Sequence, residues 1–303
     1  MSLAVLNSDS VDPGWDACRT LTCSVLPVRV ACNCSCSFCF SKSSISSLAS
    51  ERIDFGDVDV ERYYAFSKAR GATRLVITGG GEPLLRPESV VDLVARARPY
   101  FDEVAVFTNA ARLSRALAKT LSAAGVSYLC WSRHHDDDAI NRSLMGADAP
   151  DAADVVAACL DLLPIRLTTV MAKGFIDDRA AAFRMMRQFQ DRGIEQFTFK
   201  HTYVAWERSL FRDGDEDRWA AAHSVQQDPF DDDDGPAVLR LPWGPAIRDI
   251  SLPNGVVRAA FYFEPDPGWE KEHRLCRSLN LLSDGRVFAS LEDTSSLLLQ
   301  LTS

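Results

Sequence analysis

The sequence predicts an α/β fold in which parallel strands form a sheet covered by helices. Apolar runs alternate with helical stretches from about residue 52 to 202, and several of these stretches end in glycine, at Gly71, Gly125 and Gly193. The 303 residues are 47% hydrophobic and 25% charged, as in an ordinary globular chain. Such a sheet closes into a barrel or stays open and doubly wound, and ligands bind at the carboxyl ends of its strands.

The elements follow one another in a regular order. Strands are expected at 24–31, 73–78, 103–109, 127–132, 165–171 and 195–201. Helices are expected between them, at 58–71, 87–100, 113–125, 151–163 and 178–193.

The pattern changes after residue 202. The segments "FRDGDEDRW" and "DPFDDDDGP" are acidic, and we expect the run Asp231–Asp234 to be a solvated loop because the spacing of a calcium loop is missing. Asn254-Gly255 and Asp284-Gly285 are typical of tight turns between antiparallel strands. We therefore expect residues 203–303 to form an α+β extension with hairpins, packed on the main sheet with little core of its own.

Bulk properties narrow the function. The net charge of −9 and the pI of about 5.1 argue against a nucleic-acid partner. No apolar run is long enough to cross a membrane, and the first 20 residues lack the pattern of a secretory signal. We expect a cytoplasmic protein, whose nine cysteines are reduced thiols available for metal or redox chemistry.

The stretch "CNCSCSFCF" places four thiols within eight positions. Cys32, Cys36 and Cys39 have the spacing C-x3-C-x2-C, and three thiolates hold three irons of a [4Fe–4S] cube while the fourth iron stays open for a ligand. The alternatives are a zinc site, to which Cys34 would add a fourth ligand, and buried structural thiols. The short loop favours the iron–sulfur interpretation.

A second motif, "LVITGGGEPLL", follows the strand at 73–78. Gly79, Gly80 and Gly81 allow the backbone to approach a ligand closely, and the carboxylate of Glu82 can accept hydrogen bonds from an ammonium group. The alternative is a glycine turn before a helix that begins near Pro83 or Pro87.

Together the two motifs resemble those of the radical S-adenosylmethionine (radical SAM) superfamily. The resemblance covers residues 24–202 and implies a partial (β/α)6 TIM-like barrel, preceded by an N-terminal segment (1–23) and followed by the extension (203–303). It implies a [4Fe–4S] cluster on Cys32, Cys36 and Cys39, with S-adenosylmethionine on the open iron. The cofactor contacts that it implies are Phe38 near the adenine, Gly79 to Glu82 at the methionine ammonium, Thr108 and Asn109 at the ribose or methionyl part, and Ser132 and Arg133 at the ribose and carboxylate.

For Ser132 and Arg133 the alternative is a helix cap and a surface charge.

In this family, an electron from an external reductant such as flavodoxin or ferredoxin cleaves the cofactor. The 5′-deoxyadenosyl radical then abstracts a hydrogen atom from the substrate.

The outcome after hydrogen abstraction depends on a hydrogen donor. Cys276 resembles the single late cysteine of radical SAM epimerases, including one that acts on an aminoglycoside, and Arg274 and Arg277 are expected to lower its pKa. Cys130 is the other candidate, and Cys276 as a buried small apolar residue is the simpler interpretation. We favour epimerisation in natural-product biosynthesis. Dehydration, dehydrogenation, sulfur insertion, peptide maturation and a non-catalytic zinc protein stay as alternatives.

Polar residues near the strand ends suggest a hydrophilic substrate, such as a sugar, a nucleoside or an aminoglycoside, and a solvated loop is the alternative for the His and Asp residues after the strand at 127–132. Acidic residues late in the chain suit a cation, although surface charge is the simpler interpretation. These residues are His134, His135, Asp136 to Asp138, Lys200 and His201, and the acidic Glu264, Asp266, Glu292 and Asp293.

Overall fold

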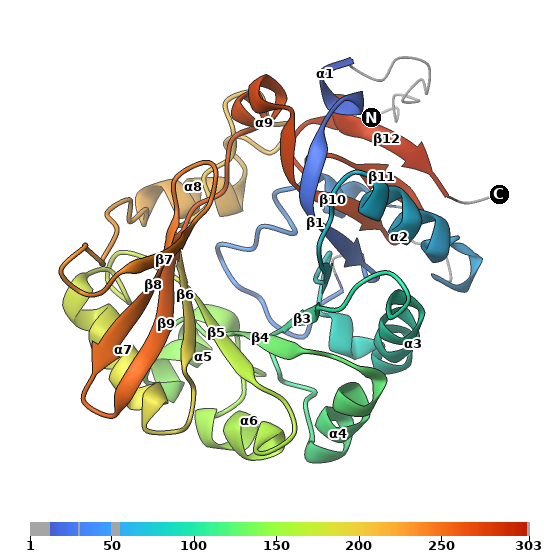
Figure 1. The fold of residues 1–303 in the computed structure, drawn as a ribbon. Helices are drawn as coiled ribbons and strands as arrows, with labels where there is room; N and C mark the ends of the chain where they lie inside the picture. Colours follow the sequence, from blue (N-terminus) through green and yellow to red (C-terminus); the bar gives the residue numbers. More distant parts are fainter. Residues whose placement is uncertain (1–12, 30, 50–54, 302–303) are drawn as a thin grey trace.

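The computed structural model describes residues 13–29, 31–49 and 55–301, and its core is one curved sheet with helices on the outside (Figure 1). The twelve strands of this sheet have the order β12-β11-β10-β1-β2-β3-β4-β5-β6-β9-β8-β7. All neighbours from β10 to β9 are parallel, and the pairs beyond them are antiparallel. The sheet is a partial barrel that stays open, as the fold prediction requires.

The strands and α-helices have the following bounds. The strands are β1 (Arg19–Leu26), β2 (Leu75–Ile77), β3 (Val104–Thr108), β4 (Tyr128–Ser132), β5 (Ile165–Val170), β6 (Gln196–Lys200), β7 (Ala237–Arg240), β8 (Ala246–Leu252), β9 (Gly255–Tyr262), β10 (Leu275–Leu282), β11 (Arg286–Phe288) and β12 (Leu297–Gln300). The α-helices are α1 (Pro13–Asp16), α2 (Val60–Ala69), α3 (Pro87–Ala97), α4 (Arg115–Ala124), α5 (Asp138–Met145), α6 (Ala152–Cys159), α7 (Arg179–Gln190), α8 (Asp215–Ala222) and α9 (Pro267–His273).

Local sequence explains where several helices begin and end. The side chains of Ser114 and Asp178 accept hydrogen bonds from the backbone N–H groups of Leu117 and Ala181, so each caps its helix. Gly125 ends α4 at φ 105°, a left-handed conformation that suits glycine. The five expected helices and the strands between them are all present, with trimmed ends.

Two elements differ from the prediction. The first strand begins at Arg19 and ends at Leu26, earlier than the expected range 24–31, of which residue 30 lies outside the described residues. The helix α5 was not expected, because Asp136–Asp138 was interpreted as part of a polar loop. In the structure Asp137 caps α5 by accepting a hydrogen bond from Ile140 N.

The C-terminal segment completes the sheet rather than forming a separate layer. Strand β10 pairs with β1 and strand β9 pairs with β6, so residues 203–303 extend both ends of the predicted six-strand array. Both expected hairpins are present, β8–β9 around Asn254-Gly255 and β10–β11 around Asp284-Gly285. The hydroxyl of Tyr63 on α2 donates to Ser24 O at 2.8 Å and Leu279 O at 2.9 Å, which ties α2 to β1 and β10.

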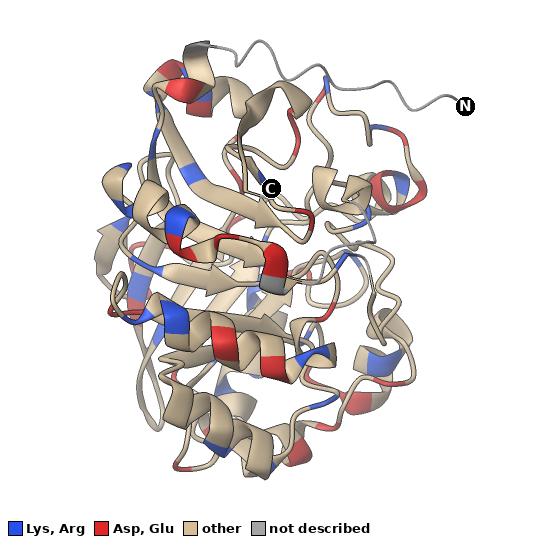
Figure 2. Ribbon diagram, turned by 90° about the vertical axis from the view of Figure 1, so that its right-hand side faces the viewer, with Lys and Arg blue, Asp and Glu red and all other residues tan. Residues whose placement is uncertain are grey.

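Charged residues of both signs are interspersed over the helices on the side of the molecule seen in Figure 2. In the described part of the chain, no helix is both long and apolar enough to cross a membrane.

Candidate functional site

The thiol loop, residues 31–44, follows β1 at the carboxyl edge of the sheet. Cys32 is exposed, and Cys34, Cys36 and Cys39 are half-buried. The loop is held against the end of α5, because Ser35 N donates to Met145 O at 2.7 Å. Cys34, Cys36 and Phe38 also pack against an apolar cluster that includes Met145. The α5 helix therefore supports the face of the thiol loop that the sheet does not reach.

The glycine turn, residues 79–81, supports the opposite face of the thiol loop and the residues that lead into it. A Cβ atom on Gly80 would lie 2.1 Å from Val28 O, and one on Gly81 would lie 2.0 Å from Ala31 O. Glu82 N donates to Ala31 O at 2.8 Å. Sequence reasoning assigned these glycines to the approach of a ligand, and the structure shows Gly80 against the backbone of Val28 and Arg29 and Gly81 against that of Ala31.

Glu82 joins the glycine turn to the end of β3. Its side chain is 3% exposed and accepts hydrogen bonds from Leu84 N (2.9 Å), Thr108 Oγ1 (2.7 Å) and Asn109 N (2.8 Å). Burial raises the pKa of this carboxyl group, and the hydrogen bonds from Asn109, Thr108 and Leu84 act against that rise.

Asn109 extends the same network to the thiol loop. Its side-chain Nδ2 lies 3.6 Å from Cys32 Sγ and donates to Asn33 Oδ1 at 3.0 Å. The structure thus brings together Cys32, Glu82, Thr108 and Asn109, which sequence reasoning selected separately. Sequence reasoning did not select Asn33 as a site residue. Its position next to Cys32 was the feature that could have indicated it.

The thiols differ in their electrostatic environment. A hydrogen bond with Cys34 is the main cause that lowers the pKa of Cys32 to about 6, whereas burial raises the pKa of Cys36 to about 12 and also raises that of Cys39. Among the described residues, no group of three or more His, Cys, Asp or Glu side chains is arranged to hold a metal ion. The donor set itself, three thiols on one loop with an amide donor at Cys32, has the chemistry of an iron–sulfur site.

Ser132 and Arg133 lie in different surroundings. Ser132 ends β4 on the face of the sheet that also carries Cys130. Arg133 is fully buried between the rings of Trp131 and Phe189, at 5.5 and 5.3 Å, and its Nη2 lies 2.6 Å from Asp138 Oδ1. It is not the surface charge of the simpler interpretation, and its guanidinium faces the α7 layer rather than the thiol loop.

Cys276 lies far from the thiol loop. It is fully buried at the amino end of β10, opposite Thr20, while the loop follows the carboxyl end of β1, where Leu26 pairs with Leu282. The six residues from Cys276 to Leu282 span roughly 20 Å of strand.

The pKa of Cys276 differs from the expectation. A hydrogen bond with Cys18, together with burial, raises it, whereas Arg274 and Arg277 were expected to lower it. The side chain of Arg277 pairs with Glu264 instead, at 2.7 Å. Cys130, the other candidate donor, packs with Ala105 and Tyr128 in a small apolar cluster, and burial raises its pKa to about 12.

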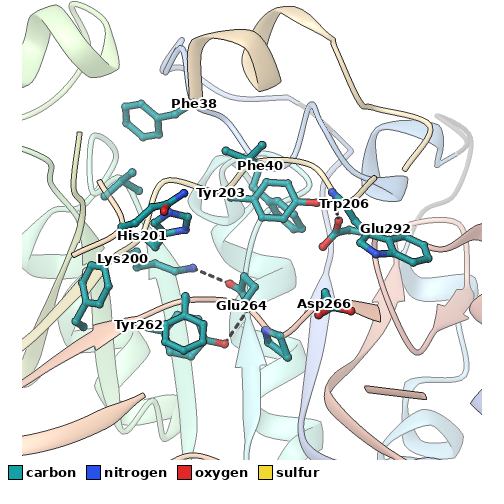
Figure 3. A pocket seen from close by; sticks show the side chains of 16 residues that line it. Phe38, Phe40, Lys200, His201, Tyr203, Trp206, Tyr262, Glu264, Asp266 and Glu292 are labelled. Atoms are coloured by element: carbon teal, nitrogen blue, oxygen red, sulfur yellow. Dashed lines mark hydrogen bonds and ion pairs between the residues drawn. The ribbon is translucent and has the colours of Figure 1, made fainter. Parts of the chain in front are cut away.

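A cavity of about 390 Å³ lies beside the thiol loop, which contributes Phe38 and Phe40 to its wall (Figure 3). The ends of β6 and β9 and the segments that follow them supply most of the remaining wall. The polar and aromatic residues from these parts are Lys200, His201, Tyr203, Trp206, Phe261, Tyr262, Phe263, Glu264 and Asp266, and Gln226 and Glu292 join them from after α8 and β11. The aromatic residues of "HTYVAW" (201–206) and "FYFE" (261–264) lie at or just after strand ends. They could have predicted this cavity wall from the sequence, but they were not considered there.

Charges in the cavity are partly paired. Glu264 lies 3.1 Å from Lys200 Nζ and accepts a hydrogen bond from the Tyr262 hydroxyl at 2.9 Å. Burial lowers the pKa of His201, and its ring Nε2 lies 3.2 Å from Ser224 Oγ. Lys200, His201, Glu264, Asp266 and Glu292 were all selected from the sequence, and the structure brings them together.

His134 and His135 were expected as substrate contacts or loop residues, and both are buried. His134 Nδ1 accepts a hydrogen bond from Val170 N at 3.0 Å, and burial lowers its pKa to about 3, so the ring is neutral. The edge of the ring contacts Phe38, with 4.7 Å between the ring centroids. His134 therefore supports the ring of Phe38 by direct contact.

Comparisons with known proteins concern the family and the fold of this chain. A family model described as the radical SAM superfamily matches residues 26–199. A probable GTP 3′,8-cyclase of Thermococcus kodakarensis is 29% identical over 161 residues, covering 52% of this chain and 50% of the relative. A GTP 3′,8-cyclase of Lactiplantibacillus plantarum is 29% identical over 191 residues, covering 60% of this chain and 56% of the relative. The chain thus spans about half the length of the curated relatives that it matches.

A solved structure supports the fold. SuiB from Streptococcus suis, bound to S-adenosylmethionine, superimposes with a TM-score of 0.57 at 14% identity, covering 90% of this chain and 60% of SuiB.

Proposed function

The chain belongs to the radical SAM superfamily, and from that premise we propose that it is an enzyme that cleaves S-adenosylmethionine reductively and abstracts a hydrogen atom from a polar small molecule in the cavity of Figure 3. The main support for this proposal is that the thiol loop contributes to both sites. It carries the thiols Cys32, Cys36 and Cys39, and it also supplies Phe38 and Phe40 to the cavity wall. Cofactor and substrate would therefore meet across a single loop.

The residues of this chain have separable roles in the proposal. Cys32, Cys36 and Cys39 hold the [4Fe–4S] cluster, which supplies the electron for cleavage when it is bound. Phe38, held by His134, lies beside the adenine. Because three donors already occupy its carboxylate, Glu82 mainly fixes the backbone of the glycine turn toward the methionyl part.

The remaining assignments follow from the same network. Thr108 donates to Glu82 and so positions the turn, while Asn109 and Ser132 stay as proposed cofactor contacts. Arg133 is left out, because its guanidinium is enclosed between Trp131 and Phe189. An external reductant such as flavodoxin or ferredoxin would deliver the electron.

Epimerisation, as in the tailoring of a natural product, stays our preferred outcome, with Cys130 replacing Cys276 as the hydrogen donor. Cys130 lies two residues before the carboxyl end of β4, and its side chain shares a sheet face with Ser132. Cys130 is therefore close to the carboxyl edge of the sheet, where the thiol loop lies. Cys276 lies at the opposite edge.

The names of the relatives supply a second candidate, cyclisation of GTP. A triphosphate needs several cations around it. In the cavity Lys200 is already paired with Glu264, and Asp266 and Glu292 add negative charge. The charges therefore favour a neutral or cationic substrate, and GTP belongs in the assay as the competing compound.

The test uses two variants of neighbouring thiols. Anaerobically reconstituted Cys36→Ala should lose most of its iron and form no 5′-deoxyadenosine, because a ligand to the cluster is gone. Cys34→Ala should keep both, because Cys34 is not one of the three proposed ligands and its backbone N–H, which donates to Cys32 Sγ at 3.3 Å, is retained. Equal iron content and equal cofactor cleavage in the two variants would overturn the assignment of the three thiols.

A further inference from the structure

We propose that the substrate carries a protonated amine and that Glu292 receives it. This inference rests on the proposed function, since it names the class of molecule that enters the same cavity. The inference depends on three observations. Glu292 is a buried carboxylate without an ion-pair partner among the described residues, the two other carboxylates of the cavity are in different environments, and aromatic rings lie around Glu292.

Glu292 is buried at the cavity wall, beyond β11. Its side chain is 8% exposed, and Oε2 accepts a hydrogen bond from Trp206 N at 2.9 Å. Among the described residues, no Lys, Arg or His forms an ion pair with it. A buried carboxylate without a cation is costly, so a cationic ligand that reached it would bind favourably. Burial is also the main cause that raises the pKa of Glu292.

The other two carboxylates of the cavity are already engaged. Glu264 pairs with Lys200 at 3.1 Å and with Arg277 at 2.7 Å, and it also accepts from the Tyr262 hydroxyl. Asp266 is exposed to solvent, unlike Glu292, and it caps α9 by accepting from Trp269 N at 3.0 Å. Glu292 is therefore the carboxylate in this cavity with the capacity to bind an added cation.

Aromatic side chains surround Glu292. Figure 3 shows Tyr203, Trp206 and Glu292 grouped together, apart from Lys200, Tyr262 and Glu264. Phe40 meets Tyr203 edge to face, with 4.6 Å between ring centroids. The faces of such rings attract an ammonium group, and the effect grows when water is excluded.

The hydroxyl of Tyr203 supports the same interpretation. It is buried next to the carboxylate of Glu292, with which it interacts, and its oxygen can still accept a hydrogen bond from a ligand. An ammonium group has three donors, and Glu292 Oε1 with the Tyr203 oxygen offers acceptors for two of them. The cavity volume of about 390 Å³ admits a small molecule of the size of an amino sugar.

The experiment compares an amine with its neutral counterpart. Glucosamine and N-acetylglucosamine are the probes, and binding to the anaerobic holoenzyme is measured by ligand-detected NMR. Saturating S-adenosylmethionine is present, so that the amine does not occupy the methionyl site. We expect glucosamine to bind wild type at least tenfold more tightly than N-acetylglucosamine.

Glu292→Gln is the informative variant, because its amide oxygen still accepts from Trp206 N while the charge is removed. It should lose the tenfold preference for glucosamine. Glu272→Gln, the same change on the exposed face of α9, should keep the preference. Tyr203→Phe, which keeps the ring, should reduce the preference about threefold and serves if Glu292→Gln does not fold.

Three results would overturn the proposal: equal binding of the two probes, no binding of glucosamine to wild type, or an unchanged preference in both Glu292→Gln and Tyr203→Phe. A wild-type protein that cleaves no S-adenosylmethionine would instead overturn the proposed function, independently of the probes.

Discussion

Glu82 shows how a single buried carboxylate organises the cofactor end of the molecule. Its oxygens accept from Leu84 N, just after the glycine turn, and from Thr108 and Asn109 at the end of β3, and the side chain of Asn109 connects this network to Cys32. Such a network is strong when every donor is satisfied and costly when one is not. The thiol loop therefore depends on a residue that holds no metal.

We expect Glu82→Gln to weaken this network, because its amide N–H₂ would face backbone or hydroxyl donors. The loss should be about 1–3 kcal/mol in free energy of unfolding, with a fall of at least tenfold in 5′-deoxyadenosine formation. Urea unfolding and product analysis measure the two effects. Glu88→Gln, at an exposed position of α3, is the control, and identical behaviour of the two variants would contradict the role of Glu82.

The two candidate donor thiols should behave differently. Cys276→Ala should retain turnover, because Cys276 is buried at the end of the strand opposite to the thiol loop. If the outcome is epimerisation, Cys130→Ala should still form 5′-deoxyadenosine but no product. Liquid chromatography of both compounds decides the matter. Loss of product in Cys276→Ala alone would restore the original assignment.

At the scale of elements, the glycine turn and α5 hold the thiol loop between them. The turn does so by close backbone approach, with Gly80 against Val28 and Gly81 against Ala31. On the other side, Met145 at the end of α5 accepts from Ser35 N. The thiol loop is thus shaped by contacts from two elements that are distant in sequence.

Gly80→Ala should displace the thiol loop, because the added Cβ would lie 2.1 Å from the backbone carbonyl oxygen of Val28, and the backbone would have to shift. The iron content after reconstitution should fall below half of the wild-type value. In Gly214→Ala the new Cβ would lie 3.3 Å from its nearest neighbour, and the iron content should stay near that of wild type. Full iron loading of Gly80→Ala would show that the close approach is not required.

Sequence patterns were sufficient for the parts of the site that are local. The spacing of Cys32, Cys36 and Cys39 and the turn "GGGEP" were visible because each motif is continuous in the chain. Glu292 and Tyr203 were not recognisable as neighbours, since 88 positions separate them and only the sheet order brings them together. The burial of Arg133 between Trp131 and Phe189 could not be predicted, because sequence does not show which face of a strand end is covered by a helix.

At the scale of the whole molecule, the C-terminal segment is part of the barrel. Alternation of strands and helices predicted the sheet from β1 to β6, but it could not show that β10 would pair with β1 and β9 with β6. Pairing between distant strands depends on which apolar faces need covering, and that information is not local. The cavity exists only because β9 and the residue Glu292 lie beside β6 and the thiol loop.

A chain ending at residue 202 should therefore not fold cooperatively. It would lose β10, which pairs with β1, and β9, which pairs with β6. Tyr63 would also lose its acceptor Leu279 O. Circular dichroism during urea titration should show a broad, non-cooperative change. A sharp transition like that of the full chain would contradict the view that residues 203–303 complete the sheet.

The most direct measurement is the fate of S-adenosylmethionine in the reduced, anaerobically reconstituted full chain. With about four irons per chain, the protein should convert the cofactor to 5′-deoxyadenosine and methionine in equal amounts, and Cys36→Ala should form neither. A fully loaded cluster with no cleavage of the cofactor under strong reduction would contradict the proposed activity.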